Sequence, residues 1–158
     1  MIHKYLDDLE ALKTELSSIR RGGRAGHKRP HKLIMLLAVI DLFEDNLLSD
    51  NRIYLDDNLI RRFKQHFSRY KAKDDLCQPA PPFFHLRSSS FWHHKILPGK
   101  EEEYKKTSTT GGGRKRVDEL IEYSYLSEQV YQIMINQALR QELRQYLQLL
   151  LEQPEIRQ

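Results

Sequence analysis

The sequence contains a single cysteine, Cys77, among 158 residues. One cysteine excludes an intramolecular disulfide and any cysteine-rich zinc module. Long apolar runs are also missing: the longest, residues 33–40, is far shorter than the roughly 18 residues that a membrane span requires. Residues 1–10 carry acidic side chains and no apolar signal core, so secretion is not expected. We therefore expect a cytoplasmic protein that contacts no membrane.

Signatures of catalysis are equally scarce. His93 and His94 are adjacent, so on a strand they would point to opposite faces, and no histidine follows them to complete an HNH nuclease site. Residues 103–105 (Glu-Tyr-Lys) match part of a metal-dependent nuclease signature, but their flanks are polar instead of forming a buried strand. Glycines 111–113 are not followed by the Lys-Ser/Thr of a phosphate-binding Walker loop. We predict no enzymatic activity, no metal site and no cofactor.

Positive charge is concentrated in two stretches of the chain. Lys and Arg number 26 against 22 acidic residues, which gives a net charge of only +4. However, residues 20–32 (RRGGRAGHKRPHK) and 61–73 are rich in Lys and Arg and contain no acidic residue. Segregated positive charge suits a polyanion, because each neutralised phosphate releases counterions. The glycines of the first stretch predict an exposed binding loop, whereas the second stretch could equally be a solvated helix face.

The apolar pattern predicts a mostly helical chain. Spacings of three and four predict an amphipathic helix from residue 2 to about residue 21. Pro30 is expected to begin a second helix, which is buried on every face along residues 33–40 and ends near Asn46. A third helix is expected after a cap at Asp57 or Asn58. A last helix is expected from Ser127 to about residue 151.

The remaining segments predict a small antiparallel sheet. Short strands are expected at residues 52–55, 83–86 and 91–96, an extended proline segment at 78–82, and a mobile loop at 98–116. The expected fold class is α+β and mostly α-helical. It is a single compact, winged-helix-like domain over residues 1–153, followed by a tail at 154–158.

Pro81 and Pro82 are unusual neighbours for basic residues. Their rings carry no N–H, so together they form a dry surface without hydrogen-bond donors. A phosphate oxygen against such a surface would lose hydration and gain no hydrogen bond. A larger, more polarisable anion would fit this surface better.

Several segments resemble one known family in order and spacing. Residues 29–32 (Arg-Pro-His-Lys), followed by the apolar run 33–37, resemble the opening of the sulfur-binding domain found in McrA-like type IV HNH restriction endonucleases. Residues 82–87 and 91–92 resemble its central segment, and residues 123–126 and 140–151 resemble its closing helices. The likeness covers residues 5–151. That family recognises DNA in which sulfur replaces a non-bridging phosphate oxygen.

The resemblance implies roles for particular residues. Pro81, Pro82 and His85 would form the sulfur cavity, although family members often have a tyrosine in place of Pro81 and a small residue in place of His85. Lys32 could equally be a structural cap on the buried helix. Phosphate or base-edge contacts are implied for Arg24, His27, Lys28, Arg29, His31, Lys32, Arg87, Ser88, Ser89 and Ser90.

The expected partner is double-stranded DNA carrying phosphorothioate linkages. An HNH nuclease domain, in the same chain or in another subunit, would then cut the modified DNA, because this sequence shows no nuclease site of its own. Two alternatives stay open. One is a winged-helix-type regulator that binds unmodified DNA through the same basic loop. The other is a non-catalytic interaction subunit of a DNA-defence complex, which would offer the apolar stripe of residues 139–151 to a partner helix.

Overall fold

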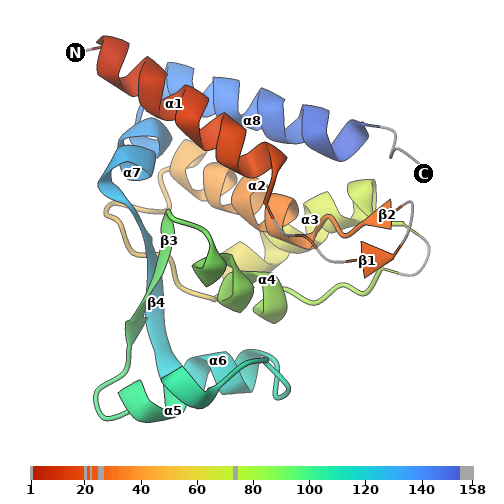
Figure 1. Cartoon of the computed structure of the whole chain (residues 1–158), viewed down its shortest axis with the longest axis vertical. Coiled ribbons are helices and arrows are strands. Elements are labelled where there is room, and N and C mark those ends of the chain that lie inside the picture. The colour runs from red at the N-terminus through yellow and green to blue at the C-terminus, as the bar shows by residue number, and fades with distance from the viewer. Residues whose placement is uncertain (1, 20, 22, 25–26, 73–74, 154–158) are drawn as a thin grey trace.

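The structure is a computed structural model that describes residues 2–19, 21, 23–24, 27–72 and 75–153. Helix α2 (His31–Glu44) lies at its centre, and residues 33–40 are all buried as the apolar run predicts. Helices α3, α4, α7 and α8 pack against it (Figure 1). The prediction of one compact, mostly helical α+β domain is confirmed. The predicted tail, residues 154–158, lies outside the described residues.

Helix α1 (Ile2–Ser17) packs over the centre beside α7 (Glu128–Ile135) and α8 (Gln137–Glu152) (Figure 1). Its buried face consists of Leu9, Leu12 and Leu16, at the spacings that predict a helix. The helix ends before the predicted residue 21. The Ser17 hydroxyl donates to the carbonyl oxygen of Thr14 at 2.7 Å, so a local side-chain bond accompanies its last turn.

The predicted last helix is interrupted at Asn136. The Asn136 Oδ1 atom accepts a hydrogen bond from the Leu139 N–H at 3.0 Å and caps α8, so residues 127–151 form two helices instead of one. Leu139, Leu143 and Leu147 are buried within the domain. These three leucines of the stripe predicted for a partner helix therefore pack inside this chain, whereas Leu149 is exposed.

Helix α3 (Asp57–Tyr70) begins one residue earlier than its predicted caps allow. The Asp56 carboxylate accepts the Leu59 N–H at 3.0 Å, so Asp56, and not Asp57 or Asn58, is the N-cap. The helix is strongly amphipathic: Arg61, Lys64 and Arg69 are exposed, whereas the half-buried Arg62 pairs with Asp45 at the end of α2. Its buried side chains are Leu59, Phe63 and Phe67.

Two predictions about residues 78–86 are wrong. Residues 80–85 form helix α4 (Ala80–His85), and residues 86–88 continue as the short 3-10 helix η1 (Leu86–Ser88). Pro81 and Pro82 lie in the first turn of α4, where backbone N–H groups have no partner inside the helix, so proline costs no hydrogen bond. The same backbone φ angle suits an extended chain, which is why the prolines alone did not distinguish the two conformations.

The main sheet is a two-stranded antiparallel ribbon. Strand β3 (Trp92–Ile96) pairs with β4 (Ile121–Leu126), so residues 123–126 are strand and not part of a closing helix. The strand predicted at residues 52–55 is reduced to one bridge, in which Ile53 and Ser124 exchange two backbone hydrogen bonds of 2.7 Å. Ser124 therefore lies between its two pairing partners, His94 on β3 and Ile53.

The predicted loop at residues 98–116 is wrong, because it contains α5 (Glu101–Lys106) and the start of α6 (Arg114–Leu120). Three glutamates in the first turn of α5 and two lysines in its last turn complement the helix dipole. Both helices lie at the far end of the ribbon, away from α1 and α8 (Figure 1).

The basic stretch before α2 contains two short strands among its described residues. Strand β1 (Gly23–Arg24) pairs antiparallel with β2 (His27–Lys28). The winged-helix-like arrangement is not confirmed. Within the described ranges, none of the helices combines the length and the apolar character that crossing a bilayer demands.

Candidate functional site

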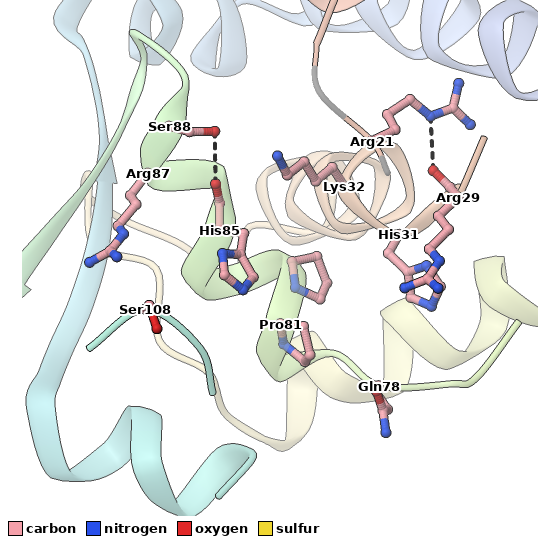
Figure 2. A pocket seen from close by; sticks show the side chains of 11 residues that line it. Arg21, Arg29, His31, Lys32, Gln78, Pro81, His85, Arg87, Ser88 and Ser108 are labelled. Carbon is pink, nitrogen blue, oxygen red and sulfur yellow. Dashed lines mark hydrogen bonds between the residues drawn. The ribbon is translucent and has the colours of Figure 1, made fainter. Parts of the chain in front are cut away.

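A cavity of about 520 Å³ opens beside α4. Its walls come from the chain before α2, the first turn of α2, the segment before α4, α4 itself, η1 and the loop after α5 (Figure 2). The lining residues are Arg21, Arg29, His31, Lys32, Gln78, Pro81, Pro82, His85, Arg87, Ser88 and Ser108. Residues predicted for phosphate contact and for sulfur contact thus meet in one cavity.

Four of the described lining residues are permanent cations, and none is a carboxylate. Arg29 is exposed, and its carbonyl oxygen accepts a hydrogen bond from the Arg21 Nε–H at 2.8 Å, which holds the two residues together. Lys32 is half-buried on the first turn of α2, and Arg87 is half-buried on η1. Cations gathered around a concave surface attract anions to it. The charges of the described lining residues therefore favour a negatively charged group in this cavity.

The prolines supply the apolar wall. Pro81 is half-buried and Pro82 is buried, yet both contribute to the cavity surface. Neither residue has an N–H to offer, so this wall cannot donate a hydrogen bond from its backbone. The two prolines are not enclosed away from the basic residues, because Lys32 and Arg87 line the same space.

His85 ends helix α4 and lies half-buried beside the prolines (Figure 2). Burial lowers the pKa of its imidazole below the usual 6.5, and the positive charges of Lys32 and Arg87 lower it further. His85 therefore favours the neutral imidazole more strongly than a free histidine does. A neutral imidazole adds one donor and one acceptor to the wall without adding charge.

His31 lines the cavity but already has a structural partner. Its Nε2 atom donates to the carbonyl oxygen of Leu76 at 2.6 Å, which ties the segment before α4 to α2. Its ring also packs against Phe67, with 5.4 Å between centroids. His31 therefore shapes the cavity by fixing the chain that carries Gln78.

Arg87 is held by three contacts. Its guanidinium lies 4.1 Å from the ring centre of Phe84 and 5.0 Å from that of Tyr104, and it donates to the Thr107 carbonyl oxygen at 2.9 Å. Stacking on aromatic faces favours a planar guanidinium over a lysine. Arg87 thus ties α4 to the end of α5 and brings the neighbouring Ser108 to the cavity (Figure 2).

The three serines after Arg87 separate into two groups. Ser88 lines the cavity, and its hydroxyl donates to the His85 carbonyl oxygen at 3.1 Å. Ser89 instead caps the backbone by donating to the Leu86 oxygen at 2.7 Å. Ser90 bonds the Glu15 carboxylate through its N–H and its hydroxyl. The structure does not bring Ser89 or Ser90 into the cavity.

Three predicted contacts are not placed at the side-chain level. The backbones of Arg24, His27 and Lys28 form the β1–β2 pair just before α2, but their side chains lie outside the described part of the structure.

Sequence reasoning missed three lining residues, Arg21, Gln78 and Ser108. Arg21 belongs to the basic stretch 20–32, so its charge was a usable signal. Gln78 precedes the proline pair and could have been found from that position. Nothing in the sequence near Ser108 points to this cavity, because tertiary contacts between Arg87 and the end of α5 carry it there.

Glu103, which belongs to the nuclease-like triplet of residues 103–105, has structural partners. Hydrogen bonding to Arg116 and the charge of Lys100 lower the pKa of Glu103, whose carboxylate lies 3.4 Å from the Arg116 guanidinium. Burial raises the pKa of Cys77, which disfavours its reactive thiolate form. Among the residues that the structure describes, no three His, Cys, Asp or Glu side chains gather to hold a metal ion.

Comparison with known proteins adds no relative: neither a family model nor a curated protein matches this chain.

Proposed function

We propose that this chain is a DNA-binding module that recognises phosphorothioate-modified DNA. The observation that carries the proposal is the meeting of a proline wall and four cations in one cavity. Apart from Arg21, these residues come from two segments far apart in the sequence, residues 29–32 and 81–87. Residues 29–32 and 82–87 are also segments that resemble the sulfur-binding domain.

The proline wall would discriminate sulfur from oxygen. Sulfur is larger and less strongly hydrated than oxygen, so contact with Pro81 and Pro82 costs it little. An ordinary phosphate oxygen against the two prolines would lose its water and gain no donor from them. An unsatisfied polar group of this kind costs roughly 1–3 kcal/mol. That difference corresponds to about a tenfold to hundredfold preference for the modified strand.

The cations would supply affinity that does not depend on sequence. Arg21, Arg29 and Lys32 line the cavity and would neutralise backbone phosphates around it. Phosphate contacts position a protein on DNA, whereas base contacts specify the sequence. Gln78 and Ser108 carry uncharged donors and acceptors at the cavity surface and are the lining residues best suited to reach a base edge.

The module would act by delivery and not by catalysis. In this proposal it works in the cytoplasm and brings an HNH nuclease, in the same polypeptide or in a second subunit, to modified DNA. A regulator of unmodified DNA would use the same cations and would not need the proline wall.

The decisive experiment is a titration of two labelled duplexes that are identical except for one sulfur atom, at fixed salt. Tighter binding of the modified duplex is expected. Equal affinity for both duplexes would reject sulfur recognition and favour the regulator of unmodified DNA. Weak binding of both, unaffected by Arg29→Ala, would favour an interaction subunit. Lys115→Ala, on the exposed surface of α6, is the matched control for a lost charge outside the cavity.

A further inference from the structure

His85 is the titratable side chain closest in the chain to the proline wall, and it lines the cavity with Pro81 and Pro82. Figure 2 shows its ring beside Pro81 on α4, with Lys32 and Arg87 on neighbouring elements. Its ring is also packed edge-on against Phe84, with 5.1 Å between centroids. The imidazole is thus held at the wall by packing and not by an ion pair.

We propose that the protonation state of His85 sets how strongly this site prefers sulfur over oxygen. This inference rests on the proposed function and adds a chemical control to it. With His85 neutral, the wall offers at most one uncharged donor and tolerates sulfur better than oxygen. With His85 protonated, the same wall presents a charged N–H donor that an ordinary phosphate oxygen can use. The change is an uptake of one proton from solvent, with no covalent step.

The charges that face His85 explain why the neutral form prevails in the empty site. Lys32 approaches from α2 and Arg87 from η1, while Arg21, Arg29 and His31 line the same cavity from the chain before α2 and from its first residue. No carboxylate lines it among the described residues. Burial and the two nearest cations lower the pKa of His85 in agreement with this arrangement.

An anion in the cavity opposes this preference of His85 for the neutral form. Its negative charge offsets the repulsion from Lys32 and Arg87 and therefore favours the imidazolium. The gain is unequal for the two ligands, because a charge-assisted hydrogen bond to oxygen is about twice as strong as a neutral one and sulfur is a weaker acceptor. Acidification should therefore strengthen binding of ordinary DNA more than binding of modified DNA.

The test measures the affinities of the two matched duplexes at constant ionic strength from about pH 5.5 to about pH 8, the range in which histidine titrates. For the unaltered protein, the ratio of affinities should fall by about tenfold on acidification. His85→Gln cannot take up a proton, so its ratio should stay constant with pH. His85→Ala provides a second variant with the same expectation. His93→Gln, at a half-buried histidine on β3 outside the cavity, is the control and should behave as the unaltered protein does.

The outcomes separate this inference from the proposed function. A sulfur preference that does not change with pH, or one that changes equally in His85→Gln, overturns the role of His85 and leaves the proposed function intact. An absence of sulfur preference at every pH overturns both. The inference is supported if the ratio of the affinity for modified DNA to that for ordinary DNA falls on acidification in the unaltered protein and in His93→Gln, but stays constant in both His85 variants.

Discussion

The Nδ1 atom of His94 lies 2.8 Å from the phenol oxygen of Tyr104. Since a carbonyl oxygen can only accept, the Nε2–H of His94 donates to the Phe83 carbonyl oxygen at 3.0 Å, and Nδ1 accepts from the Tyr104 hydroxyl. The Trp92 Nε1–H donates to that same oxygen at 2.9 Å. The two bonds to the Phe83 carbonyl oxygen join β3 to α4, and the bond to Tyr104 joins β3 to α5. The helix that carries the proline wall is therefore anchored to the ribbon.

His94 makes stability depend on pH. Burial lowers its pKa to about 4, against 6.5 for a free histidine. Between these values the unfolded chain binds more protons than the folded protein, so the free energy of unfolding rises with pH across this window. The loss on acidification should reach up to about 3 kcal/mol. Urea unfolding of the unaltered protein and of His94→Gln at several pH values between 4 and 6.5 measures this loss. If the free energy of unfolding changes with pH equally in both proteins, His94 is not the group responsible.

Replacing Pro82 by serine should reduce sulfur preference. The serine hydroxyl and the restored N–H introduce donors at the wall, so ordinary phosphate is penalised less and the affinity ratio falls by about tenfold. The affinity for modified DNA should change little. Pro98→Ser, at an exposed residue outside the cavity, controls for the loss of a proline from the chain. An unchanged ratio in Pro82→Ser would remove the wall from the mechanism.

Arg29→Ala should weaken binding of both duplexes to a similar extent. Arg29 is exposed at the rim of the cavity, so its loss removes one phosphate contact and lowers the salt dependence of the binding constant by about one counterion. Titrations at several salt concentrations check this. A selective loss of binding to the modified duplex alone would show that Arg29 contacts the sulfur-bearing group directly.

Arg87→Ala should destabilise the fold by about 1–2 kcal/mol, because it removes the hydrogen bond to Thr107 and the stacking on Phe84. Arg87→Lys keeps the charge but not the planar stacking, so it should restore only part of this stability. Denaturant unfolding of both variants is the measurement. If both retain full stability and lose DNA affinity, Arg87 acts as a direct DNA contact instead.

Asp41→Asn should cost about 2 kcal/mol. The Asp41 carboxylate lies 2.6 Å from His66 Nε2 and 2.8 Å from the Arg144 guanidinium, and it joins α2 to α3 and α8. Burial acts to raise the pKa of Asp41, but these two partners outweigh burial and lower it below 3.8. The stabilisation that ionised Asp41 provides is therefore fully present above pH 3.8, the pKa of a free aspartate, and is lost as the pH falls through the lowered pKa of the folded protein.

The control for Asp41→Asn is Asp118→Asn. Asp118 pairs with Arg114 at 3.7 Å on the surface, where an ion pair contributes little. Thermal unfolding at neutral pH and at acidic pH should separate the two variants. Equal effects would show that burial does not strengthen the Asp41 contacts.

The helices with the clearest apolar periodicity could be predicted from sequence. Residues 33–40 are apolar on every face, and only a central position satisfies them. By contrast, the period of three and four continues through Asn136, so the break between α7 and α8 was not visible. The break depends on a cap bond to Leu139 that competes with a continuous helix.

The site was predictable in composition and not in shape. The basic stretch 20–32 and the prolines after Gln78 carry the chemistry in their side chains, so their residue types were sufficient to propose an anion site beside a dry surface. Their meeting in one cavity could not be read from the chain, because α4 was expected to be a strand. For the same reason the sequence predicts DNA contacts for Ser88, Ser89 and Ser90 alike, although only Ser88 lines the cavity.

The sequence alone determined the central buried helix, the basic character of the segment before it and the donor-free chemistry of the proline pair, since each follows from residue type and local spacing. Tertiary structure decided that Pro81 and Pro82 begin a helix, that Arg87 stacks on aromatic rings, and that Ser108 faces the cavity. These features depend on contacts between distant segments, whose packing energy overrides the local preferences of the chain.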